Sequence, residues 1–399
     1  MNSPLHIRHV QVFPLAIPMR FQFEHAAAAR DTSDSIVVQL AAGAPYAHYV
    51  GYGETLARPY VTGESPSSVI EDAARIFAPL LAHFHPTTFA DALEFIEALP
   101  TEDDGRVITA ARAAIELALI DLVGKVFRRR PADITGWMGL AGFGEPGCLA
   151  DASYSGIVAG NSPAKLRGLL RLQRCYGLRD FKIKVGNQGW ERRLAWTHDR
   201  LKSLLERQLV TLRADANGAW SLVEANEAIE LLERCGVCAL EQPLPDSHDC
   251  DLPYLAEQTR CDLIADESLL TLGDAQRLIE LGAVKVFNIR IAKNGGLMPA
   301  LRIARLALSN DIDVQLGCLV GETSILSAAG VGFLSACPKV RFVEGAYGRF
   351  LLRKDVTNRP LRFGRGGRIA RPSGDGLGVV VNETALRALC VNPPRSFPI

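Results

Sequence analysis

The sequence predicts an α/β protein in which a barrel of parallel strands and helices follows a separate α+β region. Three observations support this fold class. Short β-rich runs alternate with amphipathic helical segments from about residue 150 onward, polar residues close several of these runs, and the first part of the chain has a different pattern. Strands that alternate with helices are typical of parallel sheets, because each helix returns the chain to the same end of the sheet.

The first part of the chain has mixed periodicity. Strand-like alternation covers residues 6–15, 35–43 and 48–54, and helical periodicity covers residues 66–84, 91–99 and 108–127. In the last of these segments, Ala111, Ile115, Ala118 and Leu122 recur at helix spacing with polar residues between them. We therefore expect a small α+β domain at the N-terminus.

The barrel is predicted from eight strand-like runs spread over about 200 residues. These runs cover residues 154–160, 180–186, 209–217, 236–244, 261–268, 283–291, 313–320 and 341–347. The helical segments between them include residues 163–176, 222–235, 272–282 and 297–310. The tail from Leu351 to Ile399 is rich in Gly, Pro and Arg, with one apolar strand-like run at 376–382. We expect this tail to return to the first domain or to cover it.

Composition and charge set only broad limits on function. The chain has 399 residues, of which 48% are hydrophobic and 22% are charged, which is ordinary for a soluble globular protein. The formal net charge is zero, so nothing indicates a nucleic-acid or acidic-membrane partner. The first residues lack the pattern of a signal peptide, and no stretch approaches the roughly 20 apolar residues that span a bilayer. We expect a cytoplasmic protein.

The nine cysteines suit a reducing compartment, because their number is odd and their spacing irregular. Cys235 and Cys238 form a CxxC pair, but no second pair or HxxxH follows at zinc-finger spacing. We interpret them as buried free thiols, with a metal or redox role as the alternative.

Three carboxylates close successive strand-like runs. Asp215 ends LRAD, Glu241 ends CALE and Asp266 ends LIAD, at intervals of about 25 residues, or one βα unit per step. The C-terminal ends of barrel strands converge on one face, so these acids are predicted to share a site. Three close carboxylates repel one another unless a cation neutralises them, and hard oxygen ligands suit Mg²⁺. The alternative is that each acid lies on a surface loop or caps the following helix.

Two lysines precede this series by one βα unit. Alternation along FKIK places Lys182 and Lys184 on the same side of the strand. Neighbouring cations disfavour each other's charge, so one of them can act as a general base. An edge strand with a solvated lysine face would give the same pattern. All eight histidines lie at or before His248, so the later strands offer no histidine base.

Taken together, these motifs resemble the enolase superfamily, and within it the subgroup of muconate lactonizing enzymes, dipeptide epimerases and o-succinylbenzoate synthases. The matching motifs are FKIKVG, RADANGAW, LEQPL, IADES and NIRIAKNGG, with AARAAIELALIDLVGK and VGYGE upstream. The resemblance implies an α+β capping domain at 1–130, a modified (β/α)₇β barrel at 131–350 and a C-terminal segment at 351–399 that returns to the cap.

The resemblance also assigns roles to the site residues. It implies that Asp215, Glu241 and Asp266 bind Mg²⁺, with Mn²⁺ as an alternative, and that Lys184 is the base, with Lys182 tuning it. Sites of this superfamily pair a Lys or His base with Mg²⁺ that stabilises an enediolate. The implied reaction removes the α-proton of a small carboxylate substrate and holds the resulting enolate on the metal. Relatives often assemble as dimers or octamers, so a homo-oligomer is expected.

One position departs from the family pattern. The sixth strand of the subgroup carries a second acid/base lysine, where this chain has Arg290, and Lys293 does not obviously replace it. Arginine stays protonated and cannot act as a base, although it can stabilise an oxyanion or pair with a substrate carboxylate. Alternatively, Arg290 merely pairs with Asp266, Glu267 or another local acid.

This departure favours a one-base reaction, so we expect a cycloisomerase or a lyase such as a dehydratase. The alternatives are a dipeptide or N-acyl amino acid epimerase or racemase, a catalytically degraded relative that binds a carboxylate, and a Schiff-base aldolase that uses Lys184. The resemblance implies that residues 23–30 and 53–63 are cap loops that close over the site. Candidate substrate-binding residues in these loops and in the barrel are His25, Arg30, Arg58, Tyr60, Lys293 and Glu322.

Overall fold

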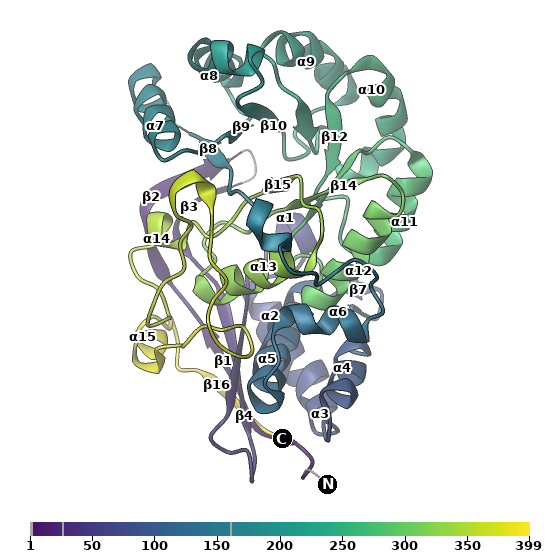
Figure 1. The fold of residues 1–399 in the computed structure, drawn as a ribbon, viewed down its shortest axis with the longest axis vertical. Helices are drawn as coiled ribbons and strands as arrows, with labels where there is room; N and C mark the ends of the chain where they lie inside the picture. Colours follow the sequence, from purple (N-terminus) through teal and green to yellow (C-terminus); the bar gives the residue numbers. More distant parts are fainter. Residues whose placement is uncertain (1–2, 26–27, 160–161) are drawn as a thin grey trace.

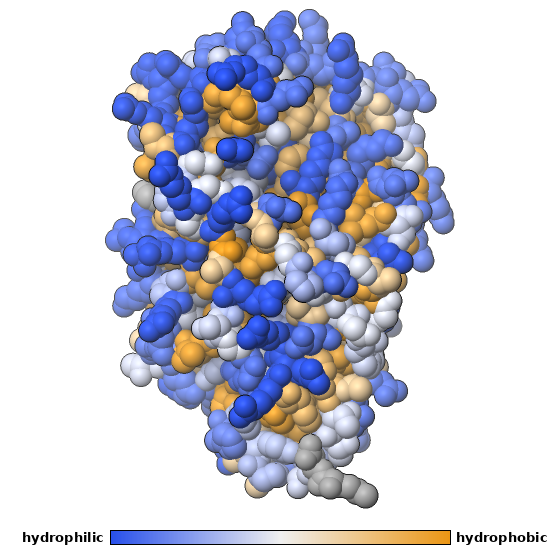
Figure 2. Space-filling model, viewed as in Figure 1, coloured by the Kyte–Doolittle hydropathy of each residue, from blue (hydrophilic) through white to orange (hydrophobic). Residues whose placement is uncertain are grey.

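The computed structural model describes residues 3–25, 28–159 and 162–399, and the side chains of residues 21–30 lie outside this description. Figure 1 shows a barrel with an outer layer of helices above a strand-rich cap, and both chain termini lie at the far end of the cap. The hydrophilic side chains in Figure 2 cover both parts on this face.

The barrel sheet has eight strands in the order β15-β14-β13-β12-β11-β10-β9-β8, and each paired neighbour is parallel. The strands are β8 (Gly156–Val158), β9 (Asp180–Lys184), β10 (Thr211–Asp215), β11 (Ala239–Glu241), β12 (Asp262–Ala265), β13 (Val286–Ile289), β14 (Asp313–Leu316) and β15 (Phe342–Val343). The sheet closes through a single bridge between Tyr154 and Val343, where Ser155 N donates to Val343 O at 2.7 Å. Each predicted strand-like run contains one of these strands, so the predicted fold class is confirmed.

The register of the sheet sets the height of the polar strand ends. Asp215 is paired with Lys184 on one side and with Glu241 on the other, so these three residues lie level. Glu241 is paired with Ile264, which places Asp266 two residues past the same level. Parallel strands therefore deliver all of these side chains to one end of the barrel.

Seven main helices surround the sheet: α7 (Pro163–Cys175), α8 (Trp190–Glu206), α9 (Leu222–Arg234), α10 (Leu252–Gln258), α11 (Leu272–Leu281), α12 (Leu297–Leu308) and α13 (Ser324–Ala336). Most are amphipathic; in α9, for example, Ala225, Ala228, Ile229 and Leu232 are buried at helical spacing. The exception is α13, all of whose residues are buried, because it lies between the barrel and the cap.

The cap contains a four-stranded antiparallel sheet in the order β16-β1-β4-β5. Its strands are β1 (Ile7–Pro14), β4 (Ile36–Ala42), β5 (Val50–Thr55) and β16 (Arg395–Pro398). The chain thus ends on the strand that pairs with its first strand. Helix α5 (Thr109–Phe127) packs on β5, where a Cβ at Gly51 or Gly53 would lie about 2 Å from a carbonyl oxygen of α5. Only glycine allows this close approach.

The remaining elements of the cap and tail are short. They are β2 (Ile17–His25), β3 (Ala28–Ser33), α1 (Pro59–Thr62), α2 (Pro66–Asp72), α3 (Ala78–Leu81), α4 (Phe89–Glu97), β6 (Glu102–Asp103), β7 (Arg106–Val107), α6 (Ile134–Trp137), α14 (Gly348–Leu351) and α15 (Glu383–Ala388). The cap segment around His25, expected as a loop, forms the antiparallel hairpin β2–β3.

Two predicted elements differ from the structure. The expected helix at 66–84 is divided by a π-helical turn, Ala73–Phe77, between α2 and α3. The expected strand at 376–382 is wrong, because only Val381 makes a bridge, to Thr357. Gly376 and Gly378 have positive φ, which breaks the extended conformation, and the strand that joins the cap is β16 instead.

All nine cysteines are free thiols, and Cys235 of the CxxC pair is buried. In the part of the chain that the structure describes, no helix is long and apolar enough to cross a membrane.

Buried glutamates fasten the cap to the barrel. Glu54 of β5 accepts hydrogen bonds from Thr323 N at 2.8 Å and from Leu326 N at 2.9 Å, at the N-terminus of α13. Glu116 of α5 accepts from Leu297 N and Met298 N, at the N-terminus of α12. Helix N-termini favour negative charge and need acceptors, so each contact joins the two parts electrostatically.

These glutamates predict that stability falls as the pH rises through neutrality. Burial raises the pKa of Glu54 and Glu116 from 4.5 to about 7, and does the same for Glu64, which accepts hydrogen bonds from Ala110 N and Ala111 N within the cap. Between the pKa of the unfolded chain and that of the folded protein, the folded protein binds protons that the unfolded chain has released. The free energy of unfolding therefore decreases as the pH rises, by roughly 1–3 kcal/mol for each glutamate. Denaturant titrations in metal-free buffer from pH 5 to 8 would measure how the free energy of unfolding changes with pH.

The matched variants are Glu54→Gln and Glu94→Gln. Removing the titrating group at Glu54 should flatten the pH dependence, whereas Glu94 is exposed on α4 and its substitution should leave the slope unchanged. A stability that rises from pH 5 to 8 would contradict this account.

Candidate active site

Three buried carboxylates lie at one end of the barrel. Asp215 ends β10, Glu241 ends β11, and Asp266 follows β12, and each is completely buried. Buried carboxylates that share a site repel one another, so the structure must supply positive charge around them. Two basic side chains each lie between two of these carboxylates.

The first linking group is Lys182. Its Nζ lies 3.0 Å from Oδ2 of Asp215, 3.1 Å from Oε1 of Glu241 and 2.8 Å from Oε2 of Glu344. Burial alone would favour the neutral amine, but the charges of Glu241, Glu344 and Asp215 outweigh it and raise the pKa of Lys182. Burial and the charge of Asp215 raise the pKa of Glu241 in spite of this lysine. Lys182 is therefore held as a cation.

The second linking group is Arg290, which follows β13. Its Nη2 forms an ion pair with Oδ2 of Asp266 and lies 3.6 Å from Oε1 of Glu241. The guanidinium thus stands between two of the three carboxylates. This is the arrangement that the alternative interpretation of Arg290 expected, in which the arginine pairs with a local acid.

Lys293 lies behind Asp266 and is completely buried. Its Nζ donates to Asp266 O at 2.6 Å, to Asp266 Oδ1 at 3.0 Å and to Asn288 O at 2.8 Å. Burial, followed by the charge of Arg290, lowers the pKa of Lys293. With its hydrogen bonds directed at the protein, Lys293 orients Asp266 and does not face a substrate.

Lys184 is the lysine that faces the open side of this cluster, with 19% of its side chain exposed. Its Nζ donates to Asp215 Oδ2 at 2.5 Å and to Asn217 Oδ1 at 2.8 Å. Lys182 and Lys184 both reach Oδ2 of Asp215, as the alternation along β9 predicts. Burial would raise the pKa of Asp215, but Lys184 and Lys182 outweigh it and lower that pKa.

A second layer of polar residues beneath the cluster was missed by sequence reasoning. Arg213, two residues before Asp215, donates to Gln315 Oε1 at 2.5 Å, to Glu344 Oε1 at 3.0 Å and to Ser155 Oγ at 2.9 Å. Gln315 in turn donates to Glu241 Oε2 at 2.9 Å. The period of two along each strand would have found these residues, since each lies on the inward side of its strand.

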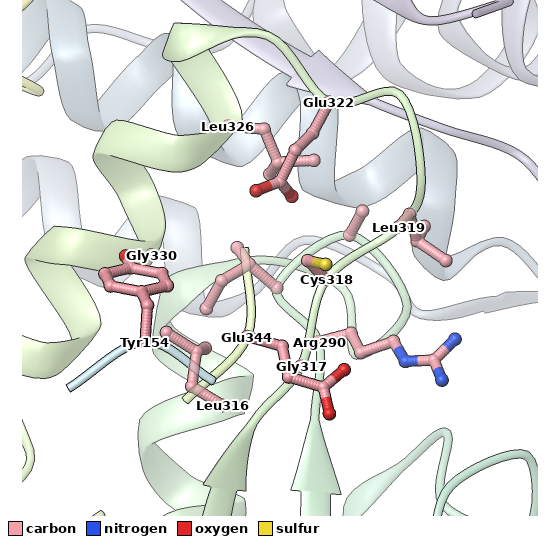
Figure 3. A pocket seen from close by; sticks show the side chains of 12 residues that line it. Tyr154, Arg290, Leu316, Gly317, Cys318, Leu319, Glu322, Leu326, Gly330 and Glu344 are labelled. Carbon is pink, nitrogen blue, oxygen red and sulfur yellow. The ribbon is translucent and has the colours of Figure 1, made fainter. Parts of the chain in front are cut away.

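Glu322 lies in a small pocket next to Arg290. In Figure 3, Tyr154 and Glu322 lie at different edges of this pocket, Cys318 lies on the side of Leu319, and the Arg290 side chain leads away from Tyr154. Burial raises the pKa of Glu322 to about 8, although Ala346 N and Ser327 Oγ donate to Oε1 at 3.1 Å. Glu322 is therefore a largely protonated acid at neutral pH.

The cap candidates divide into two groups. Arg58 is buried, and its guanidinium donates to Asp34 Oδ1 at 2.6 Å and to Val320 O at 3.1 Å, so it anchors the cap to the loop after β14. Tyr60 is exposed at the start of α1. The side chains of His25 and Arg30 lie outside the described residues.

The donor chemistry of the cluster fits a hard divalent cation. Three carboxylates converge, and Oε2 of Glu267 is buried without a hydrogen-bond partner among the described residues. As arranged, no three His, Cys, Asp or Glu side chains of the described chain could hold a metal ion, because basic groups separate the carboxylates. Asp215, Glu241 and Asp266 thus fit Mg²⁺ or Mn²⁺ by type and position once Arg290 moves aside.

Comparisons with known proteins identify the family of this chain. The profile of the family described as enolase C-terminal domain-like matches residues 166–385. An L-Ala-D/L-Glu epimerase of Bacteroides thetaiotaomicron is 28% identical over 82% of this chain and 80% of its own. Muconate cycloisomerase 1-2 of Acinetobacter lwoffii is 26% identical over 84% of this chain and 82% of its own.

Solved structures show the same fold. An enolase superfamily member from Listeria innocua superposes with a TM-score of 0.82 at 20% identity, covering 99% of both chains. A dipeptide epimerase from Cytophaga hutchinsonii, complexed with Mg and the dipeptide D-Ala-L-Val, gives 0.78 at 22% identity over 98% of this chain and 99% of its own.

The lysine that links the carboxylates should contribute strongly to stability. Lys182→Met would leave Asp215, Glu241 and Glu344 without their shared cation, so we expect a loss of roughly 3–5 kcal/mol in the free energy of unfolding. Denaturant titration without added metal measures this loss.

Two variants test the cause of that loss. Adding Glu344→Gln to Lys182→Met removes one of the three negative charges that lose this cation and should recover part of the stability. Lys285→Met, at an exposed position before β13, should change stability by no more than about 0.5 kcal/mol. Equal effects of Lys182→Met and Lys285→Met would contradict the bridging role.

Proposed function

The chain belongs to the enolase superfamily, with muconate cycloisomerases and dipeptide epimerases among its relatives, and on this premise we propose a Mg²⁺-dependent enzyme that removes the α-proton of a small carboxylate from one face. The reaction class is cycloisomerisation or elimination. The observation that carries this proposal is the distribution of bases in the cluster: Lys184 faces the open side, and the sixth strand ends in Arg290.

Lys184 is the proton acceptor in this proposal. Lys182 is only 3% exposed and is held as a cation by three carboxylates, and Lys293 is completely buried behind Asp266. Lys184 is more exposed than either and stands at the strand end, level with Asp215.

Arg290 restricts the chemistry to one face. Epimerisation normally needs a base on each face of the α-carbon, and a guanidinium cannot take up a proton at working pH. In the proposed reaction, the α C–H bond breaks, Lys184 keeps the proton, and the bond's electron pair enters the enolate. That electron pair then expels a leaving group from the β-carbon. In a lyase the leaving group departs from the substrate. In the opening of a lactone the leaving group is a carboxylate that stays attached to the rest of the molecule.

The proposed metal ligands are Asp215, Glu241 and Asp266. Mg²⁺, or Mn²⁺ in its place, would supply several kcal/mol of charge stabilisation to the developing enolate. The role of the protein is to hold the three carboxylates at the strand ends and to exclude water from their buried oxygens.

A second candidate function is epimerisation of a dipeptide or N-acyl amino acid. It is supported by the 28% identical epimerase of Bacteroides thetaiotaomicron and by the dipeptide epimerase structure. It requires a second base that replaces the missing lysine. A degraded relative that only binds a carboxylate is the third candidate, because Arg290 also fits a binding role.

The partners, location and assembly of the enzyme are also proposed. The zero net charge supports a protein that binds neither nucleic acid nor membrane. We propose a cytoplasmic homo-oligomer, a dimer or an octamer, by analogy with the relatives.

Solvent deuterium exchange tests the base. With Mg²⁺ and a library of muconate-like acids, sugar acids, dipeptides and N-acyl amino acids, NMR should detect exchange at an α-carbon of the true substrate. Lys184→Ala should reduce that exchange by about 10²–10⁴-fold. Lys285→Ala, at the other end of the barrel, should not change it. Exchange that survives in Lys184→Ala would contradict the assignment, and no exchange across the library would favour the binding-only candidate.

Stereochemistry tests the one-base restriction. The native enzyme should exchange the α-proton of a chiral substrate without inverting the centre, because both proton transfers use one face. Arg290→Lys restores an amine on the opposite face and should introduce measurable inversion, seen by chiral chromatography. Rapid inversion by the native enzyme would instead establish the epimerase.

A further inference from the structure

Arg290 and Arg213 are both buried arginines of the barrel, but the protein holds them differently. The guanidinium of Arg213 donates to Gln315, Glu344 and Ser155, which fixes it in place. Within the described chain, the guanidinium of Arg290 is held by the carboxylates of Asp266 and Glu241 as ion pairs. A guanidinium whose partners are two carboxylates can be released when another cation neutralises those carboxylates.

Charge balance also favours such an exchange. The cluster contains five acids, Asp215, Glu241, Asp266, Glu267 and Glu344, and five bases, Lys182, Lys184, Arg213, Arg290 and Lys293. Without a metal, the acids and the bases of the cluster are equal in number. A divalent cation among the carboxylates would add two positive charges beside a guanidinium in a buried site, where like charges repel strongly.

The side chain of Arg290 lies beside a small pocket. Its side chain lines the pocket that contains Cys318 and Glu322, next to Gly317 (Figure 3). A Cβ at Gly317 would lie 2.9 Å from Cγ of Arg290, so a larger residue at this position would crowd the stem of the arginine.

We propose that Arg290 is a displaceable counter-ion. Arg290 neutralises Glu241 and Asp266 when no divalent cation is bound, and it leaves them when the cation binds. The released guanidinium then binds a carboxylate of the substrate in a bidentate manner. The inference rests on the proposed function, because it assumes that the three acids bind a divalent cation. Its consequence is that the cation and an anionic ligand bind cooperatively, each favouring the released arginine.

Competition predicts that removal of the arginine strengthens metal binding. Titration of Mn²⁺, followed by electron paramagnetic resonance of the free ion, should show Arg290→Met binding at least about tenfold tighter than the native protein. The matched control is Arg341→Met, because Arg341 also bridges two carboxylates, Asp262 at 2.7 Å and Asp313 at 3.3 Å, at the opposite end of the strands. Its Mn²⁺ affinity should equal that of the native protein.

Cooperativity predicts the effect of an anionic ligand. Succinate, used as a dicarboxylate probe, should tighten Mn²⁺ binding to the native protein severalfold and leave Arg290→Met unchanged. Thermal unfolding gives a second readout: Mn²⁺ should raise the melting temperature of Arg290→Met more than that of the native protein, since the variant lacks the internal counter-ion. Arg290→Lys serves if the methionine variant does not fold, and should bind Mn²⁺ with intermediate affinity.

The outcomes separate the inference from the proposed function. Native protein that binds Mn²⁺ as tightly as Arg290→Met, or more tightly, overturns the displaceable counter-ion but leaves the metal-dependent enzyme standing. Absence of Mn²⁺ binding in both proteins, and in Arg290→Lys, overturns both.

Discussion

The mutual repulsion of three buried carboxylates is the constraint on which the candidate site depends. Asp215, Glu241 and Asp266 are delivered to one end of the barrel by the register of parallel strands, and each is fully withdrawn from water. Such a group of acids is unfavourable unless cations neutralise it. Lys182 and Arg290 meet that need within the protein, and a divalent cation would meet it during function.

The rest of the fold serves this arrangement. The single bridge between Tyr154 and Val343 closes the sheet, and Arg213 organises the polar layer beneath the acids. Buried glutamates of the cap hold the N-termini of α12 and α13, so the cap is fixed to the loops around the site. The same need to pair buried charge thus recurs at the site and at the interface between cap and barrel.

Sequence periodicity predicted the barrel and the strand-end residues because both follow from local patterns. Asp215, Glu241 and Lys184 fall at strand ends that alternation and βα spacing locate directly. The pairing of Arg290 with Asp266 was left open, because it depends on side-chain conformation across neighbouring strands. The strand expected at 376–382 failed, since strand formation needs a partner edge, and positive-φ glycines interrupt the run. The hairpin at β2–β3 was missed because β3 (AARDTS) has no apolar pattern, although β2 alternates apolar and polar residues.

We propose that these three acids form one divalent-cation site, and that Lys182 and Arg290 neutralise it in the absence of the ion. A crystal structure of the protein soaked in Mn²⁺, with anomalous diffraction at the manganese edge, tests it most directly. The account predicts one strong anomalous peak in contact with Asp215, Glu241 and Asp266, and an Arg290 guanidinium that no longer bridges Glu241 and Asp266. A well-ordered site with no peak there, and with Arg290 still between the carboxylates, would contradict the account.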